Sequence, residues 1–139
     1  MKNTLRADVR AESANPNLIT CKGTIMRCYL VDELHPDTLA RLEENLTARG
    51  CQSGIEKLYW VPLDKEQLLP VQIDHETSCG PHCLALEILD DGVRLELLVR
   101  AKGRMRCECV CYPSPEAERD MMRWLDARIA EAEAEGLSQ

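Results

Sequence analysis

An alternating pattern of side chains on either side of Asp91-Gly92 constrains the fold of this chain more than any other feature. Apolar residues occupy every second position from 84 to 88, and the alternation resumes from 93 to 99. A period of two residues is typical of a β-strand with one buried face, and Asp-Gly is a preferred pair for a two-residue hairpin turn. The region therefore predicts two antiparallel strands whose apolar face must be covered by another layer.

Segments before and after this hairpin complete the predicted fold. A third strand is expected over 104–112, after a turn at Ala101-Lys102-Gly103 in which the glycine has a positive φ. The other elements, in chain order, are a strand over 24–31, a helix that opens at His35-Pro36-Asp37 and stops at Gly50, a strand over 56–63, a short helix between Asp64 and Pro70, and a helix that opens at Ser114-Pro115. The fold class is α+β: a β-α-β unit followed by a three-stranded antiparallel meander and a C-terminal helix packed on the sheet.

Length and composition predict one domain with loose ends. A chain of 139 residues, of which 45% are hydrophobic, has enough apolar surface for one core. Residues 1–20 are polar and aperiodic, so we expect a flexible N-terminal arm. The single α+β domain is expected to span 21–130. Residues 131–139 are expected to form a frayed acidic tail, because glutamates lie at the negative end of the last helix dipole.

The net charge of −7 argues against broad nucleic-acid binding, which needs a positive surface. No apolar run approaches the ~18–20 residues of a membrane span, and the first residues lack the apolar stretch of a secretory signal. We therefore expect no membrane segment and a cytoplasmic location. A basic cluster at the expected hairpin tip is a candidate ligand-binding site for a small anion or an acidic peptide, and its alternative is a solvated hairpin end. The cluster comprises Arg100, Lys102, Arg104 and Arg106.

Cys107, Cys109 and Cys111 alternate along the predicted third strand, so their thiols share one face. Alternate residues of a strand have Cα atoms about 6.6 Å apart, whereas two sulfurs on one zinc ion are at most about 4.6 Å apart. A flat strand therefore disfavours one ion held by all three thiols. In the predicted register the thiols lie opposite Leu97, Leu95 and Val93. We predict that they pack in the leucine core beneath a helix, and a register change of one residue would turn them outward.

The same register places three carboxylates in a row across the outer face of the sheet: Glu87, Glu96 and Glu108. Like charges directly opposite each other destabilise a sheet, although arginines on that face can offset them diagonally. Two interpretations remain open. The row is either a carboxylate site for a cation or for acid–base chemistry, or a solvated, charge-rich sheet face.

The segment His75–Cys83 holds two thiols and two imidazoles within nine residues, in a chain with three histidines. Gly80-Pro81 ends any helix before Cys83, and side chains of adjacent residues diverge. Three of the four side chains could therefore share one ion, with Cys21, Cys28 or Cys51 completing the set. The candidate metal ligands, of types that bind zinc or iron, are His75, Cys79, His82 and Cys83.

Two other interpretations apply to the same segment. Cys79-Gly80-Pro81-His82-Cys83 resembles the Cys-Gly-Pro-Cys motif of thioredoxin-like proteins with a histidine inserted, and the resemblance suggests thiol redox chemistry. That motif has two intervening residues and precedes a helix, whereas here three residues intervene and a strand is expected to follow. The structural alternative is a bend at Gly80 and Pro81 that leads into the sheet.

We interpret the chain as a small binding or regulatory domain. Its site is expected where the His75–Cys83 segment meets the basic tip at 100–106, because Cys83 is predicted to lie opposite Arg100. The alternative is a zinc, iron or thiol redox protein that uses Cys79, Cys83 and a histidine. An edge strand near Trp60 and the amphipathic last helix also allow a homo-oligomer. No phosphate-loop, dinucleotide or HExxH pattern is present, and the sequence does not decide whether the protein is an enzyme.

Overall fold

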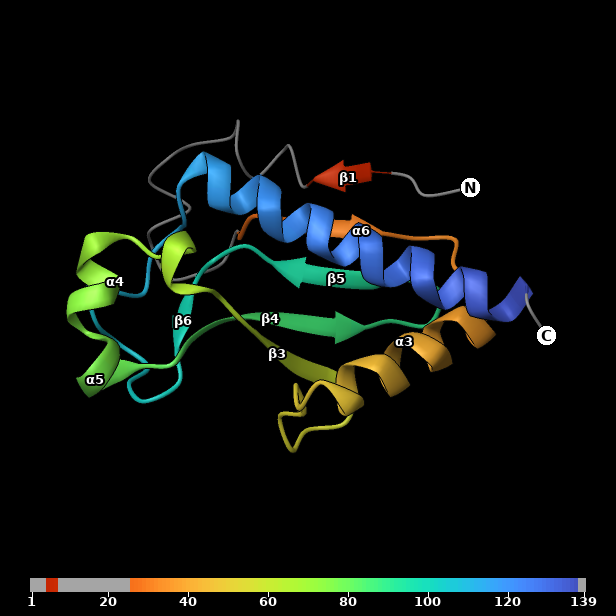
Figure 1. The fold of residues 1–139 in the computed structure, drawn as a ribbon, viewed down its shortest axis with the longest axis horizontal. Coiled ribbons are helices and arrows are strands. Elements are labelled where there is room, and N and C mark those ends of the chain that lie inside the picture. Colours follow the sequence, from red (N-terminus) through yellow and green to blue (C-terminus); the bar gives the residue numbers. More distant parts are fainter. Residues whose placement is uncertain (1–4, 8–25, 138–139) are drawn as a thin grey trace.

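A computed structural model of the chain describes residues 5–7 and 26–137. Six strands form one antiparallel sheet in the order β1-β2-β5-β4-β3, and β6 also pairs with β4. Helix α6 lies across one face of this sheet (Figure 1). In chain order the elements are β1 Leu5–Ala7, β2 Cys28–Val31, α3 Pro36–Ala48, β3 Leu58–Pro62, the 3₁₀ helix η1 Lys65–Gln67, α4 Pro70–Asp74, α5 Glu76–Cys79, β4 His82–Ile88, β5 Val93–Glu96, β6 Arg100–Ala101 and α6 Pro115–Leu137. The predicted α+β fold class is confirmed.

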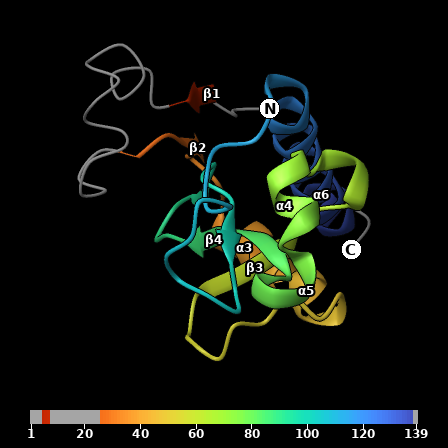
Figure 2. The same ribbon diagram turned by 90° about the vertical axis from the view of Figure 1, so that its left-hand side faces the viewer.

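The main core lies between the sheet and the two long helices. Side chains on one stripe of α6 and one stripe of α3 pack on the apolar face of β2, β3, β4 and β5. Figure 2 shows α6 to one side of the strands. The stripe of α6 follows the four-residue spacing of an amphipathic helix, and its buried members are Ala117, Met121, Leu125, Ile129 and Ala132. Packing of the C-terminal helix on the sheet is therefore as predicted.

Several local predictions are confirmed. Helix α3 begins at Pro36, and Nδ1 of His35 accepts the backbone N–H of Asp37 at 3.0 Å. The helix ends before Gly50, whose φ is +79°. Strand β3 and η1 lie within their predicted ranges, and β2 occupies the second half of the predicted strand over 24–31. Positions 24 and 25 of that strand lie outside the described residues.

The β4–β5 hairpin turns one residue earlier than predicted. Ile88 pairs with Val93, so the turn is centred on 90–91 rather than on Asp91-Gly92. Gly92 lies instead beside β2, where a Cβ atom would stand 2.5 Å from the carbonyl oxygen of Val31. Close packing against β2 therefore requires a glycine at position 92, whereas the turn itself does not.

This shift removes the predicted row of carboxylates. Glu87 faces Arg94 instead of Glu96, and the two side chains form an ion pair. Glu96 forms an ion pair with Arg100 at 3.1 Å, and Glu108 lies outside the sheet. The prediction of a Glu87, Glu96 and Glu108 row is wrong, because moving the turn by one residue moves the pairing by two. The observed register sets opposite charges together, which stabilises the exposed face modestly.

The predicted third strand over 104–112 is also wrong. Strand β6 comprises only Arg100 and Ala101, and the chain then leaves the sheet until Cys111, which forms an isolated bridge with Val99. The three thiols do not line up opposite β5, so the prediction that they pack in the leucine core is wrong as well. Two of them join a second cluster of buried residues outside that core.

Gly103 shows why the chain leaves the sheet. Its backbone N–H donates to the carbonyl oxygen of Cys79 at 2.7 Å, and a Cβ atom at this position would stand 2.7 Å from the same oxygen. Its φ is not positive, contrary to the prediction. The glycine instead allows the chain after β6 to pack directly on the end of α5.

The predicted ends of the domain are described only in part. Strand β1 lies within the predicted arm at 1–20 and pairs with β2, and the rest of the arm lies outside the described residues. Helix α6 extends into the predicted tail at 131–139, where Nε of Arg41 donates to the carbonyl oxygen of Ala132 at 2.7 Å. That cation near the end of the helix is favourable for the helix dipole. Flexibility of the arm and fraying of the tail stay predictions.

None of the helices in the described part of the chain has the length and hydropathy that a bilayer-spanning segment needs.

Candidate metal centre

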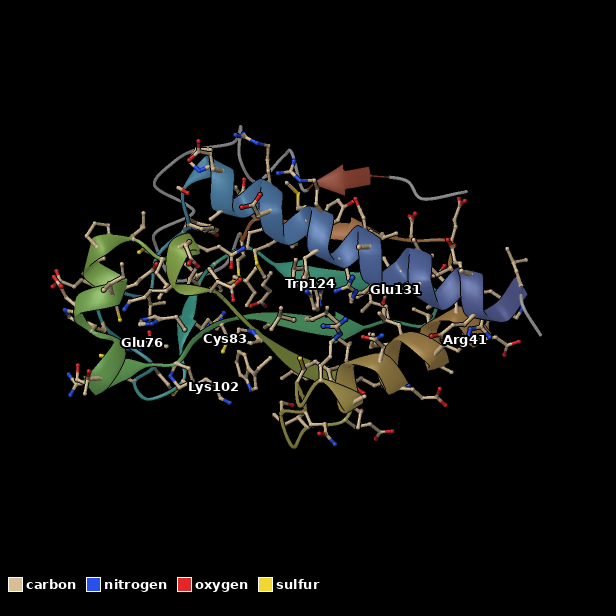
Figure 3. The ribbon with its side chains drawn as sticks, in the orientation of Figure 1. Arg41, Glu76, Cys83, Lys102, Trp124 and Glu131 are labelled. Atoms are coloured by element: carbon tan, nitrogen blue, oxygen red, sulfur yellow. The ribbon has the colours of Figure 1, made fainter. Side chains whose placement is uncertain are left out.

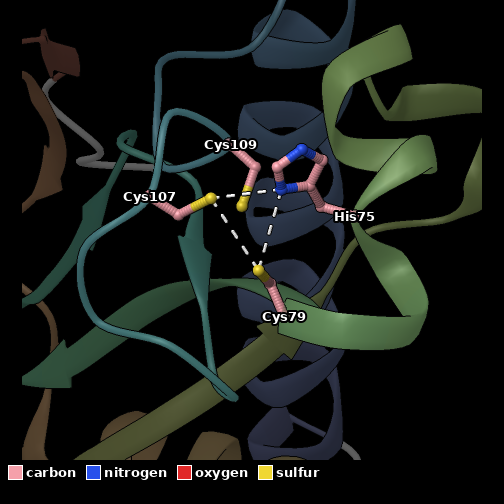
Figure 4. A group of neighbouring side chains, drawn as sticks. All are labelled: His75, Cys79, Cys107 and Cys109. Carbon is pink, nitrogen blue, oxygen red and sulfur yellow. Dashed lines mark hydrogen bonds between the residues drawn. The ribbon is translucent and has the colours of Figure 1, made fainter.

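Two segments bring one imidazole and three thiols together (Figure 4). His75 lies at the junction of α4 and α5, and Cys79 ends α5 one helical turn later. Cys107 and Cys109 come from the loop between β6 and α6. One ligand atom from each of these four residues lies within 4.8 Å of all the others. One histidine and three cysteines are among the ligand sets of structural zinc sites.

Two of the separations between these atoms match those of a tetrahedral zinc site, and a third is shorter. With Zn–S near 2.3 Å and Zn–N near 2.0 Å, two thiolates are about 3.8 Å apart, and a thiolate and an imidazole nitrogen about 3.6 Å. Sγ of Cys79 lies 3.8 Å from Sγ of Cys107 and 3.7 Å from Nδ1 of His75. The distance from Nδ1 of His75 to Sγ of Cys107 is 3.1 Å. Of these three distances, only the one between His75 and Cys107 must lengthen, by roughly 0.5 Å, to accommodate an ion.

Contacts outside the cluster hold its two halves against each other. Gln72 in α4 is fully buried, and its Nε2 donates to the carbonyl oxygen of Cys109 at 3.2 Å. The backbone contact between Gly103 and Cys79 ties the start of the same loop to α5. Such outer contacts orient metal ligands before an ion binds.

The two loop thiols differ in acidity. The pKa of Cys107 is lowered to about 7, mainly because the backbone N–H of Cys109 donates to its sulfur. Burial of the thiol acts in the opposite direction. Side-chain hydrogen bonds from Cys109, Cys79 and His75 lower the pKa further. Burial, followed by the neighbouring sulfurs of Cys107 and Cys79, raises the pKa of Cys109 to about 12. A bound metal ion deprotonates its thiol ligands. A bound ion would therefore keep both sulfurs as thiolates, despite the raised pKa of Cys109.

A carboxylate lies on the outer side of the imidazole. Nε2 of His75 is 3.7 Å from a carboxylate oxygen of Glu108, which is an ion-pair distance. In the metal-bound form Nδ1 would give its lone pair to the ion, and Nε2 would keep the proton, which faces this carboxylate. Histidines that bind metals commonly have a carboxylate or carbonyl partner of this kind.

His82 and Cys83 lie outside the cluster. The ring of His82 is fully buried, with Nδ1 2.6 Å from a carboxylate oxygen of Glu76, and its Nε2 has no hydrogen-bond partner among the described residues. Cys83 pairs with residues of β3 and β6, and burial raises its pKa to about 11. Adjacent residues of a strand face opposite sides. The four sequence-predicted metal ligands are thus divided, and the structure groups only His75 and Cys79 with further ligands. The cysteines predicted to complete the set do not do so: Cys28 and Cys51 lie outside the cluster, and Cys21 lies outside the described residues.

The Cys79–Cys83 pair of the thioredoxin-like resemblance is not bonded. All seven cysteines of the described residues are free. The raised pKa of Cys83 makes its thiol a poor nucleophile. The sulfur that lies next to Cys79 is Cys107, at 3.8 Å.

The basic tip lies beside the cluster. The backbone N–H of Lys102 donates to the carbonyl oxygen of Pro81 at 3.0 Å, and Cys83 pairs with Arg100 as predicted. Figure 3 shows Glu76, Cys83 and Lys102 at the same end of the molecule. The predicted proximity of the His75–Cys83 segment to the tip is confirmed.

The four sequence-predicted ligand-binding residues of the tip differ in their surroundings. Arg100 is half-buried and forms an ion pair with Glu96 at 3.1 Å. The other three are exposed: Lys102, Arg104 and Arg106.

No protein-family model, curated protein or solved structure matches this chain. Functional inference therefore rests on the geometry of the cluster. Two residues of the cluster, Cys107 and Cys109, were not predicted as ligands, because a flat strand over 104–112 would hold their sulfurs apart. A signal was present in the sequence: His75-x3-Cys79 and Cys107-x-Cys109 are two half-sites, and zinc sites commonly combine two short ligand pairs.

In metal-free protein at pH 7, we expect iodoacetamide to label Cys107 before Cys83. A thiol with a pKa of about 7 is roughly half ionised at that pH, and the thiolate is the reactive form. Cys83, whose pKa is about 11, stays protonated and is buried. Alkylation at increasing times, followed by peptide mass spectrometry, measures the order. Bound zinc should protect Cys107 and leave Cys83 unchanged, and faster labelling of Cys83 would contradict the expected order.

Proposed function

We propose that the protein is a metal-binding domain in which one zinc ion is held by His75, Cys79, Cys107 and Cys109. The observation that carries this proposal is the convergence of four ligand atoms within 4.8 Å. The pair Cys79 and Cys107 joins positions 28 residues apart, so neighbouring positions in the sequence do not explain the grouping. The imidazole of His75 is 28% exposed, which gives an ion access to the site.

The ligand set favours zinc over iron, the two metals that the sequence suggests. A closed tetrahedral site with three thiolates and one imidazole is a structural zinc set. Iron–sulfur clusters usually take four cysteines, or two histidines on one of their irons. Four protein ligands leave no open coordination position, and catalytic zinc needs one. We therefore propose a structural rather than a catalytic role for the ion.

The zinc ion would join the loop after β6 to α4 and α5. This loop belongs to a small buried cluster outside the main core, so it has few apolar contacts to hold it. An ion that ties the loop down would also fix the basic tip in one conformation. We propose on this basis a binding or regulatory domain, in line with the function inferred from the sequence. The predicted cytoplasmic location suits a site that needs reduced thiols.

Metal analysis of the purified protein tests this proposal. Protein expressed without a histidine tag should contain about one zinc ion per chain. Cys79→Ser and Cys109→Ser should each reduce the zinc content to background. Cys111→Ser is the matched control, because Cys111 lies on the same loop but outside the cluster, where it accepts an N–H of Gln72 at 3.5 Å. This variant should retain its zinc.

Cobalt substitution gives a second measurement, because thiolate ligands produce intense cobalt absorption bands that serine cannot produce. If the protein contained iron in place of zinc, the ligand assignment would stand and only the identity of the metal would change. A wild-type protein that takes up none of the three metals and shows eight titratable thiols would contradict the proposal. If Cys111→Ser or His82→Gln lost as much metal as Cys79→Ser does, that result would contradict the ligand assignment.

A further inference from the structure

An exposed basic loop adjoins the candidate metal centre. It comprises residues 102–106, and every residue in it is exposed. The side chain of Met105, between two arginines, is 87% exposed. Large exposed apolar side chains flanked by charge are common at contact sites. Within the described part of the chain, no ion pair or side-chain hydrogen bond is formed by Lys102, Arg104 or Arg106.

Five other arginines of the described residues have acidic partners. Their ion pairs are Arg27–Glu118, Arg94–Glu87, Arg100–Glu96, Arg123–Asp120 and Arg128–Glu131. The chain has 24 acidic residues against 17 basic ones, so intramolecular partners are abundant. Three neighbouring cations that have no acidic partner among the described residues leave a local positive potential on an otherwise acidic protein, which attracts an anionic group from another molecule.

The backbone of the basic loop is held at its base. The N–H of Lys102 donates to Pro81 at 3.0 Å, that of Gly103 to Cys79 at 2.7 Å, and that of Arg104 to Ala101 at 3.2 Å. A loop that is ordered before binding loses less conformational entropy when a partner binds. The cations and Met105 are therefore presented on a pre-organised support.

We propose that the basic loop is the docking surface for a short acidic segment of another protein, with an apolar residue between its carboxylates. Arginine binds carboxylates in bidentate geometry, and methionine adapts to apolar side chains of different shapes. A short segment fits better than a long polyanion, because the net charge of −7 repels nucleic acid and anionic membranes at longer range. The proposal rests on the zinc function in one respect: Arg106 adjoins the ligand Cys107, so the ion holds the far end of the loop.

Fluorescence anisotropy with a labelled ten-residue peptide of alternating Asp and Leu tests the proposal. We expect saturable binding at physiological salt that weakens as salt increases, because exposed ion pairs are screened. The double variant Arg104→Glu with Arg106→Glu should weaken binding at least tenfold. The matched control reverses two exposed arginines of α6, Arg119→Glu with Arg123→Glu, and should change affinity less than about twofold. Met105→Ala should weaken binding of this peptide and leave an all-Asp peptide unaffected.

Three further probes decide the identity of the partner: the same peptide with Asn for Asp, oligothymidine, and phosphatidylserine vesicles. Equal binding of the Asn peptide overturns the proposal, as does the absence of binding to the Asp–Leu peptide at millimolar concentration. Tighter binding of oligothymidine or vesicles, with the same dependence on Arg104 and Arg106, overturns the acidic segment as the occupant. Cys109→Ser separates the two proposals. If purified wild-type protein takes up no metal and still binds the peptide through these arginines, the docking surface stands and the zinc function falls.

Discussion

Removal of zinc is expected to lower the melting temperature of this protein by roughly 10 °C or more without unfolding it at 25 °C. An ion that binds only the folded state stabilises it by about 4 kcal/mol when its free concentration is 1,000 times the Kd. Each kcal/mol shifts the melting temperature of a domain of this size by about 3–5 °C. The protein should stay folded at 25 °C, because the ligands lie outside the main core between the sheet, α3 and α6.

Calorimetry with and without a chelator measures this effect. Cys109→Ser should show the lower melting temperature from the start and should not respond to the chelator, whereas Cys111→Ser should respond as the wild type does. Hydrogen exchange should accelerate over 102–111 on chelation and stay slow in β4 and α6, because local opening does not require global unfolding. An unchanged melting temperature after chelation and after addition of zinc would contradict the structural role of the ion.

Leu125→Ala is expected to lower the free energy of unfolding by about 2–5 kcal/mol, the range for removing a leucine from a packed core. Leu125 is 0% exposed and lies on the stripe of α6 that faces the sheet. The lost methyl groups leave a cavity that the surrounding sheet and helices fill only in part. Urea denaturation, with the slope of the transition compared between variants, measures the change.

Leu137→Ala is the matched control for this prediction. It makes the same substitution on the same helix, at a position that is 88% exposed, and should change the free energy of unfolding by less than about 0.5 kcal/mol. Leu125→Ala should retain the same zinc content as the wild type, because the metal cluster and the main core do not share residues. A loss below 1 kcal/mol in Leu125→Ala would show that α6 does not pack on the sheet as described.

We propose that two parts of this domain are stabilised in different ways. The sheet and its helices bury large aliphatic side chains, and hydrophobic burial is sufficient to hold them. The second cluster buries Cys79, Ala101 and Cys109, which are small side chains with little apolar area. A metal ion commonly supplies stability where a small apolar cluster cannot.

Local patterns in the sequence were sufficient for most of the fold. The ends of α3 follow from His35, Pro36 and Gly50, and the buried stripe of α6 follows from its four-residue spacing. The alternation on either side of the β4–β5 turn indicated the apolar face of both strands. Propensity, capping and periodicity concern neighbours within a few positions, so they can be read without knowledge of the tertiary fold.

Glycines were misread where their role was tertiary. Gly92 and Gly103 were assigned to turns, yet each allows a close approach to the backbone of another element, β2 for the first and the end of α5 for the second. One misplaced turn shifted Glu87 from Arg94 to Glu96 in the predicted register. The second concealed the departure of the chain from the sheet after β6. A glycine that meets a distant backbone leaves the same local pattern as a glycine in a turn.

The sequence by itself determined that His75 and Cys79 are metal-ligand types one helical turn apart and that the basic tip lies next to them. Only the tertiary structure decided which sulfurs complete the set. Cys107 lies 28 positions from Cys79, and the two sulfurs meet because the chain packs on α5 through Gly103 and is held to α4 through Gln72. A ligand set assembled from two segments depends on the path of the chain between them, and packing against other elements sets that path.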